Sequence, residues 1–138
     1  MTINKIIDWG NSNPKKLFLI DGLGATISAV LLGIVLTRLV SFIGIPESTL
    51  YFLAVIPSLF AIYDFYCYLK IENKIGIFLK TIGIANLVYC CLSVGLAIYH
   101  RATITHLGWM YVLIEVMIVG LLAYVEMKVA KRLSKRVV

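Results

Sequence analysis

The sequence predicts an all-α integral membrane protein whose chain crosses the bilayer four times. Hydrophobic residues make up 61% of its 138 residues, against about 45–50% in soluble domains, and the mean hydropathy is +0.95. A soluble domain of this length has too much surface for its volume to hide that much apolar area. The apolar residues also fall into four stretches of 20 or more, each long enough for a hydrocarbon core of about 30 Å.

The four predicted spans occupy residues 17–129 and leave only short connections between them. A polar lead over residues 1–16 comes first, and its pattern from Ile6 to Trp9 is typical of a short interfacial helix with Trp9 at headgroup depth. Pro57 falls near the middle of the second span, where its missing N–H predicts a kink. The expected spans are residues 17–40, 49–69, 75–99 and 107–129, and a basic cytoplasmic tail follows over 130–138.

The positions of the basic residues predict how the spans are oriented. The lead, the second connection with the start of the third span, and the tail hold most of the 13 Lys and Arg, and only Arg38 and Arg101 lie on the opposite side. This positive-inside bias places both termini in the cytoplasm. Because the connections are short, consecutive helices should lie antiparallel and adjacent, which predicts an up-down four-helix bundle in the cell (inner) membrane.

The net charge of +6 comes with a terminal basic run directly after the last apolar stretch. Such runs meet anionic lipid headgroups at roughly 1 kcal/mol per basic residue, so the bilayer is the expected partner. No nucleic-acid recognition module occurs, and nucleic-acid binding is not expected. The predicted membrane-surface residues are Lys128, Lys131, Arg132, Lys135 and Arg136.

Motifs for cofactors and catalysis are absent from the sequence. The three cysteines all fall within apolar stretches and form no C-x-x-C pair, so they are expected to behave as small hydrophobic residues. Neither histidine, His100 nor His106, lies within a span, where a haem ligand would be needed. We therefore expect no metal, no cofactor and no recognisable catalytic residue.

Polar residues inside the spans are the strongest candidates for a functional site, because a charge in hydrocarbon costs several kcal/mol. At helical spacing every span carries one stripe that combines polar and small side chains. One interpretation is packing, in which small residues let helices approach and polar groups bond across the seam. The other is an internal ligand site, since Asn or Ser would join helices at lower cost than Asp or Glu. The candidate ligand-binding residues are Asp21, Asp64, Asn86, Tyr89, Tyr111 and Glu115.

Depth along the helices groups the first two acidic residues. Asp21 lies five residues inside Lys16, and Asp64 lies six residues before Lys70, which at about 1.5 Å per residue places both in the cytoplasmic third of the membrane. We expect the two carboxyl groups to face each other across the first two spans. Lys80 enters the membrane to a similar depth and is either their counter-ion or a side chain that snorkels to the headgroups.

The acidic residues of the last span are expected to differ from each other. Glu115 lies nearer the middle of the membrane with no basic residue at its depth, and Asn86, also central, is its expected hydrogen-bond partner. Glu126 lies two residues before Lys128 and is expected to be interfacial and paired with a nearby lysine.

These observations leave several hypotheses about function open. The first is that the protein, alone or as a homo-oligomer, binds or passes a small cationic or amphipathic ligand by means of its intramembrane acids. The second is a non-catalytic accessory or assembly subunit of a larger membrane complex. The third is a membrane-embedded enzyme acting on a lipid or quinone, for which only Asp21 and Asp64 would qualify as paired acids; the sequence favours a non-enzymatic function. Four short spans with an acidic residue, Asp21, in the first resemble the small multidrug resistance transporters in topology only.

Overall fold

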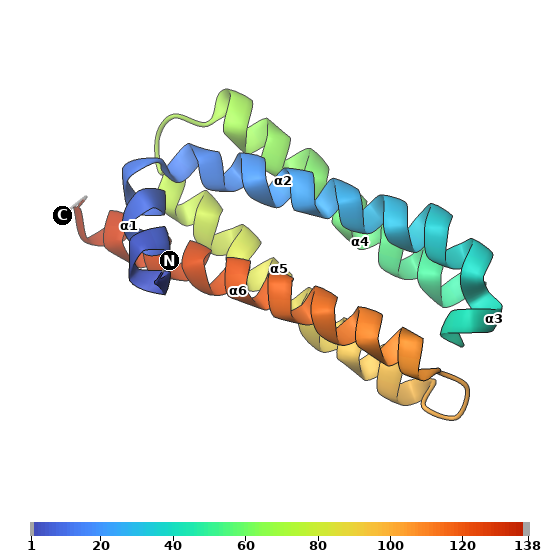
Figure 1. Ribbon diagram of the computed structural model, residues 1–138. Coiled ribbons are helices and arrows are strands. Elements are labelled where there is room, and N and C mark those ends of the chain that lie inside the picture. Colours follow the sequence, from blue (N-terminus) through green and yellow to red (C-terminus); the bar gives the residue numbers. More distant parts are fainter. Residues whose placement is uncertain (1, 137–138) are drawn as a thin grey trace.

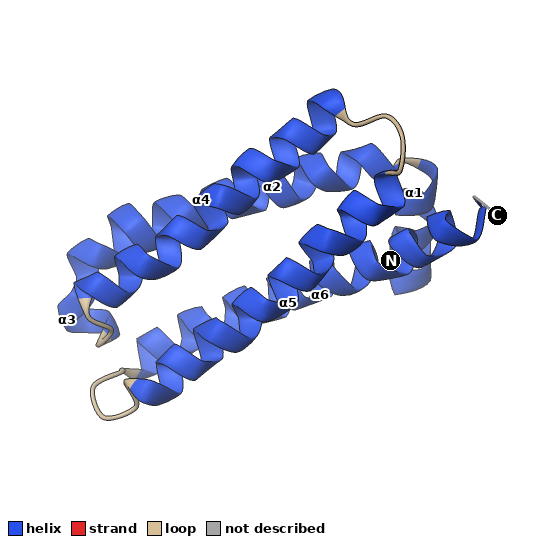
Figure 2. Cartoon of the chain, turned by 180° about the vertical axis from the view of Figure 1, so that it is seen from behind, coloured by secondary structure: helices blue, strands red, loops and turns tan. Residues whose placement is uncertain are grey.

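The computed structural model describes residues 2–136, and these residues are helical apart from short connections (Figures 1 and 2). Four helical segments are long and apolar enough to cross a membrane, which confirms the prediction of an all-α protein with four candidate spans. Many of their large hydrophobic side chains are exposed, including Met117 at 72% and Ile62 at 68%. Surrounding lipid would cover such a surface. The four segments are Pro14–Ile43, Glu47–Lys70, Ile75–Tyr99 and His106–Lys135.

The N-terminal lead forms a helix of its own, α1 (Ile3–Ser12), which is longer than the predicted four-residue pattern. Its residues Ile7 and Gly10 are buried, and α1 packs against the last turns of the chain's final helix. Asn13 leaves the helical conformation, and Pro14 then starts the next helix, where a missing N–H costs nothing. The lead is therefore an ordered part of the helical assembly.

The first span is not one regular α-helix. After α2 (Pro14–Val30) the backbone passes through a π-helical turn, η1 (Leu31–Val35), and a 3-10 turn, η2 (Leu36–Leu39), before α3 (Val40–Ile43). Within this stretch the Thr37 hydroxyl donates to the Gly33 carbonyl oxygen at 3.0 Å. Such irregular turns inside long helices often occur at functional sites.

The remaining spans are α4 (Glu47–Lys70), α5 (Ile75–Tyr99) and α6 (His106–Arg136). Helix α2 packs beside α4, and α5 packs beside α6; the two pairs touch each other much more sparsely than the partners within each pair (Figures 1 and 2). Pro57 lies inside α4 without ending it. Helix α6 continues through the first part of the predicted tail, so residues 130–136 are helical, and residues 137–138 lie outside the described part of the chain.

The connection between α5 and α6 docks on the end of the first span. Gly44 follows α3 with a φ of +81°, and its carbonyl oxygen accepts a hydrogen bond from the Thr103 hydroxyl at 2.9 Å. The Thr105 amide donates to the Ile43 carbonyl oxygen at 3.0 Å. A β-carbon at Gly44 would overlap the backbone at Thr103, and one at Gly108 would overlap the Ile43 carbonyl oxygen. The two helical pairs are therefore fastened together at this end.

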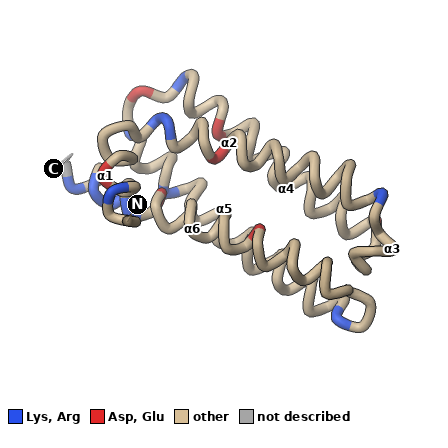
Figure 3. The backbone as a smooth tube through the Cα atoms, viewed as in Figure 1, with Lys and Arg blue, Asp and Glu red and all other residues tan. Residues whose placement is uncertain are grey.

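Two hydrophobic clusters form the core, and polar residues occupy the region between them. One cluster includes Leu32, Leu50 and Val112, towards the Gly44 end of the molecule. The other includes Phe18 and Val129, towards the end that carries both termini. Lys and Arg gather at this second end, whereas acidic residues also occur well inside the helices (Figure 3).

Candidate functional site

Four polar side chains, one from each spanning helix, meet near the terminal end of the core. Asp21 of α2, Asp64 of α4, Asn86 of α5 and Glu126 of α6 are 4%, 0%, 3% and 0% exposed. We call these four residues the acidic cluster. Each of them lies on the inward face of its helix. The four side chains therefore meet in the space between the helices.

Asn86 is the centre of this cluster. Its Nδ2 atom donates to Asp21 Oδ2 at 2.9 Å and to Glu126 Oε1 at 3.0 Å, which uses both of the amide's N–H groups. Both carboxylate oxygens of Asp64 and Oε2 of Glu126 are buried without a hydrogen-bond partner within the described residues. The Asp64 carboxyl group lies within electrostatic reach of Asp21. The cluster therefore has more acceptor atoms than donors.

The charge of the acidic cluster is not balanced by a basic side chain. The only ion pair within residues 2–136 joins Arg132 to Asp8 at 2.7 Å, on the exposed surface. Three carboxyl groups buried together without a cation cannot all carry charge at an acceptable cost, because each buried unpaired charge costs several kcal/mol. The cluster is therefore suited to holding protons. No group of three or more His, Cys, Asp or Glu in the described chain is arranged to hold a metal ion.

A second polar group lies further along the helices, around Glu115 of α6. The Tyr89 hydroxyl donates to Glu115 Oε1, and the Tyr111 hydroxyl donates to Glu115 Oε2. Glu115 is 7% exposed. The ring of Tyr89 also meets the ring of Phe60 edge to face, with 6.2 Å between centroids. We call Glu115, Tyr89 and Tyr111 the Glu115 group, and in it each carboxylate oxygen has a donor.

A pocket of about 300 Å³ lies between the two helical pairs and connects these two groups. Most of its wall is apolar or aromatic, with Ile27, Phe60 and Ile118 among the lining residues. A β-carbon added at Gly24, another lining residue, would meet no atom within 4 Å, so the wall is open there. Among residues 2–135, no Lys, Arg or His lines the pocket. The polar lining residues are Asp21, Ser28, Asn86, Tyr89, Tyr111 and Glu115.

The pocket brings together most of the predicted ligand-binding residues. Asp64 is the exception, because it lies beside Asp21 in the acidic cluster but outside the pocket lining. An added β-carbon at Gly22 would lie 3.2 Å from Asp64 Cβ, which shows how closely α2 and α4 approach at this point. Asp21 and Asp64 thus face each other, in the arrangement expected from their depths.

Two expectations about polar partners are wrong, and one of the two alternatives for Lys80 is not observed. Asn86 does not pair with Glu115; it bonds to Asp21 and Glu126 instead. Glu126 is fully buried rather than interfacial. Lys80 is exposed and makes no ion pair with Asp21 or with any other described residue, so the counter-ion alternative is not observed.

Glu126 is the functional candidate that sequence reasoning missed, although the sequence contained a signal for it. It lies eleven residues after Glu115, which at about 3.6 residues per turn is close to three full turns. The two side chains therefore share one face of α6. The nearby Lys128 favours an interfacial position, but residues two apart on a helix point to nearly opposite sides.

The predicted membrane-surface residues lie on the last turns of α6. Lys128, Lys131 and Lys135 are exposed, and Lys128 Nζ lies 5.5 Å from the centre of the Tyr124 ring. Arg132 donates to Asp8 of α1. Arg136 ends the helix, and its side chain lies outside the described part of the chain.

Comparison of this chain with protein families, with curated proteins and with solved structures finds no match.

Proposed function

We propose that this protein is a small transporter-like membrane protein that binds a cationic amphipathic ligand in the pocket between its two helical pairs. The observation that carries the proposal is the composition of the pocket wall. The wall is mostly apolar, it holds two carboxyl groups, Asp21 and Glu115, and none of the described residues that line it is basic. A ligand with an apolar body and a positive charge would satisfy both kinds of surface.

The size and the aromatic residues of the pocket favour a small ligand. A volume of about 300 Å³ is at the lower end of the range of roughly 300–1,000 Å³ for small-molecule sites. Phe60, Tyr89 and Tyr111 line the pocket, and aromatic faces attract cations, most strongly where water is excluded. The ligand's charge would lie near Asp21 or Glu115 while its apolar part contacts Ile27 and Ile118.

The acidic cluster would supply negative charge that balances the positive charge of the bound ligand. Asp21 belongs both to the pocket wall and to the cluster with Asp64, Asn86 and Glu126. When no cation is present, protons are the available means of reducing the buried negative charge. A cation that enters near Asp21 would take over that role, so its binding should release protons from the cluster. This exchange would couple ligand movement to proton movement.

The proposal includes an up-down bundle with both termini in the cytoplasm. The asymmetric distribution of Lys and Arg supports this orientation (Figure 3). The acidic cluster would then lie towards the cytoplasmic side and the Glu115 group nearer the middle of the membrane. The sparse packing between the two helical pairs would allow them to separate enough for a ligand to enter.

A binding titration with a small lipophilic cation such as benzyltrimethylammonium tests the proposal. We expect Asp21→Asn and Glu115→Gln each to weaken binding by about tenfold to a hundredfold, because a charge-assisted contact contributes roughly 1.5–3 kcal/mol. The matched control is Glu72→Gln, which removes one negative charge from an exposed connection and should leave affinity unchanged. Lowering the pH should weaken binding to the unmodified protein, since protons compete with the cation for the cluster.

Two results would contradict the proposal. One is equal affinity of the wild-type protein for the cation and for a neutral amphipathic compound of similar size. The other is an equal effect of Glu72→Gln and of the two pocket variants. In either case the pocket carboxyl groups would not recognise charge.

A further inference from the structure

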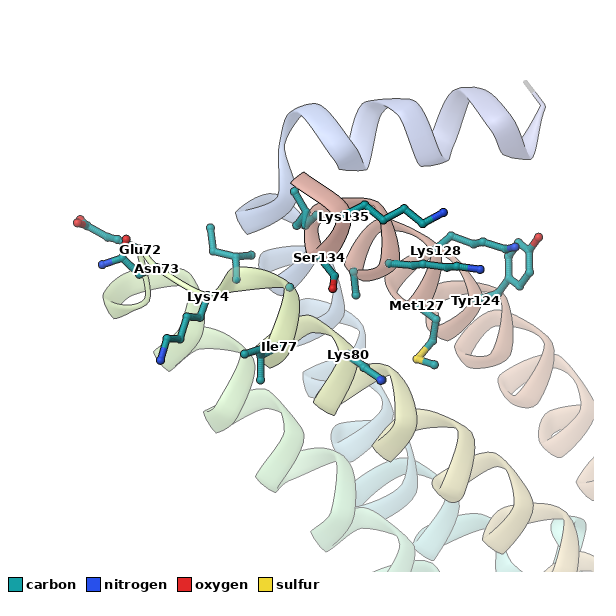
Figure 4. Close-up of a pocket in the computed structure, with 15 residues that line it drawn as sticks. Glu72, Asn73, Lys74, Ile77, Lys80, Tyr124, Met127, Lys128, Ser134 and Lys135 are labelled. Carbon is teal, nitrogen blue, oxygen red and sulfur yellow. The ribbon is translucent and has the colours of Figure 1, made fainter. Parts of the chain in front are cut away.

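A second concave surface lies outside the pocket, between the beginning of α5 and the last turns of α6 (Figure 4). It encloses about 1210 Å³. One acidic residue, Glu72, lies at the far end from Tyr124 (Figure 4). Five basic residues line the surface, which we call the lysine groove: Lys74, Lys80, Lys128, Lys131 and Lys135.

Helical spacing explains why so many lysines of α6 reach the groove. Tyr124, Lys128, Lys131 and Lys135 follow one another at steps of four, three and four residues, so they form a single stripe along the helix. Lys80 of α5 extends to the same side as Lys128 and Tyr124 (Figure 4). None of the groove lysines makes an ion pair within residues 2–136. The groove therefore presents positive charge that the described residues do not neutralise.

Below the lysines, the groove has an apolar floor. Gly76 and Ala130 bring the two helices close together, since a β-carbon at Gly76 would lie 3.3 Å from the Ala130 carbonyl oxygen. Ile77 and Met127 also line the groove. A charged group bound among the lysines would therefore rest on apolar surface and could not pass between the helices.

The lysine stripe continues along α6 as an apolar stripe. Leu121 lies three residues before Tyr124, and Met117 lies four residues before Leu121. Both side chains are exposed. The same face of one helix thus changes from lysines to a tyrosine and then to hydrocarbon. This order matches that of a phospholipid, which has a phosphate, an interfacial glycerol region and acyl chains.

We propose that the lysine groove binds an anionic phospholipid of the surrounding bilayer. Its phosphate would lie among Lys80, Lys128 and Lys131, and an acyl chain would run along Leu121 and Met117. Complementary charge favours an anionic headgroup, and the apolar continuation favours a membrane lipid over free phosphate. The groove shares no lining residue with the pocket of the proposed function, so either proposal can fail without the other.

The test uses the full-length protein in nanodiscs of phosphatidylcholine, titrated with phosphatidylglycerol, with retained lipid counted by native mass spectrometry. We expect Lys80→Gln/Lys128→Gln/Lys131→Gln to weaken phosphatidylglycerol binding by about a hundredfold, which corresponds to roughly 1 kcal/mol for each of three lysines. The matched control, Lys5→Gln/Lys15→Gln/Lys16→Gln, removes the same charge from residues outside the groove. It should weaken binding by less than about threefold, because exposed charges at a distance are screened.

Equal weakening in the two triple variants would overturn the proposal, since it would indicate diffuse attraction to the whole basic surface. Equal retention of phosphatidylcholine and phosphatidylglycerol by the wild-type protein would overturn it as well. A second variant, Leu121→Gln, tests the acyl-chain contact without altering any lysine. It should weaken lipid binding relative to Leu113→Gln, which changes another exposed leucine of α6. Full displacement of the lipid by excess glycerol phosphate would instead point to a free phosphate site.

Discussion

Asn86 is the residue on which the acidic cluster depends most. Its side chain places two N–H donors between the carboxyl groups of Asp21 and Glu126, and no other donor to these groups is present within the described residues. A neutral amide stabilises two acids at once without adding a charge of its own. Loss of the amide would leave the carboxyl groups facing each other in a buried space.

We therefore expect Asn86→Ala to lower the free energy of unfolding by about 1–3 kcal/mol, the usual cost of leaving buried polar groups unsatisfied. Thermal unfolding in mild detergent, at neutral pH, measures this effect. Asn73→Ala, at an exposed position in the connection before α5, is the control and should change little. The difference between the variants should shrink in acid, where protonated carboxyl groups can donate hydrogen bonds to each other. Equal stability of both variants at neutral pH would show that Asn86 does not hold the cluster together.

The sequence allowed prediction of which residues point inward but not of which residues meet. Periodicity along a single helix places Asp21, Asp64, Asn86 and Glu115 on inward faces. The partners depend on the order and rotation of the helices around the bundle, which periodicity does not encode. For this reason the sequence predicts a hydrogen bond between Asn86 and Glu115, whereas in the structure Asn86 donates to Asp21 and Glu126.

At the scale of elements, the junction between α3 and the α5–α6 connection determines how the helical pairs are joined. Gly44 has a left-handed φ that L side chains rarely adopt, and backbone atoms near Thr103 occupy the space where its β-carbon would be. A β-carbon at Gly108 would overlap the Ile43 carbonyl oxygen. Both glycines are required by close backbone approach, and Gly44 is required by its conformation as well.

We expect Gly44→Ala and Gly108→Ala each to destabilise the protein by about 1–3 kcal/mol, because the backbone must shift to accept a methyl group. Gly95→Ala and Gly120→Ala are the matched controls, since an added β-carbon there meets no atom within 4 Å. These controls should be neutral or stabilising by up to about 1 kcal/mol, because alanine favours helix. Melting temperatures of the four variants, measured in one detergent, test this prediction. A control variant that melts at as low a temperature as Gly44→Ala would contradict it.

Helix positions were easier to predict than helix regularity. Hydropathy identified four apolar stretches because a spanning helix must satisfy its backbone internally over the whole hydrocarbon core. The irregular turns over Leu31–Val35 and Leu36–Leu39 leave no such signal. The first of them contains Gly33, which lies close to α4: a β-carbon there would lie 3.3 Å from Ala54 Cβ.

At the scale of the whole molecule, the basic residues separate the two ends of the bundle. Both termini and most of the Lys and Arg lie at one end (Figure 3). The acidic cluster lies towards this end, and the docked connection around Thr103 lies at the other. The proposed orientation therefore predicts that the end with the termini faces the cytoplasm and that the end around Thr103 is accessible from outside the cell.

Labelling with a membrane-impermeant maleimide on intact cells tests this orientation in a cysteine-free background. We expect Ser48→Cys and Ala102→Cys to react, because both positions are exposed and lie near the connections that the proposed orientation places outside the cytoplasm. Ser12→Cys and Asn73→Cys should react only after the cells are permeabilised. The reverse pattern would place both termini outside and would contradict the proposed orientation.

Glu115 and Glu126 are carried by the same face of one continuous helix, eleven residues apart. At about 1.5 Å per residue their backbones are separated by roughly 16 Å along α6, and no irregular turn lies between them. Because the helix between them is continuous, a rotation of α6 about its axis would withdraw both carboxyl groups from their partners together.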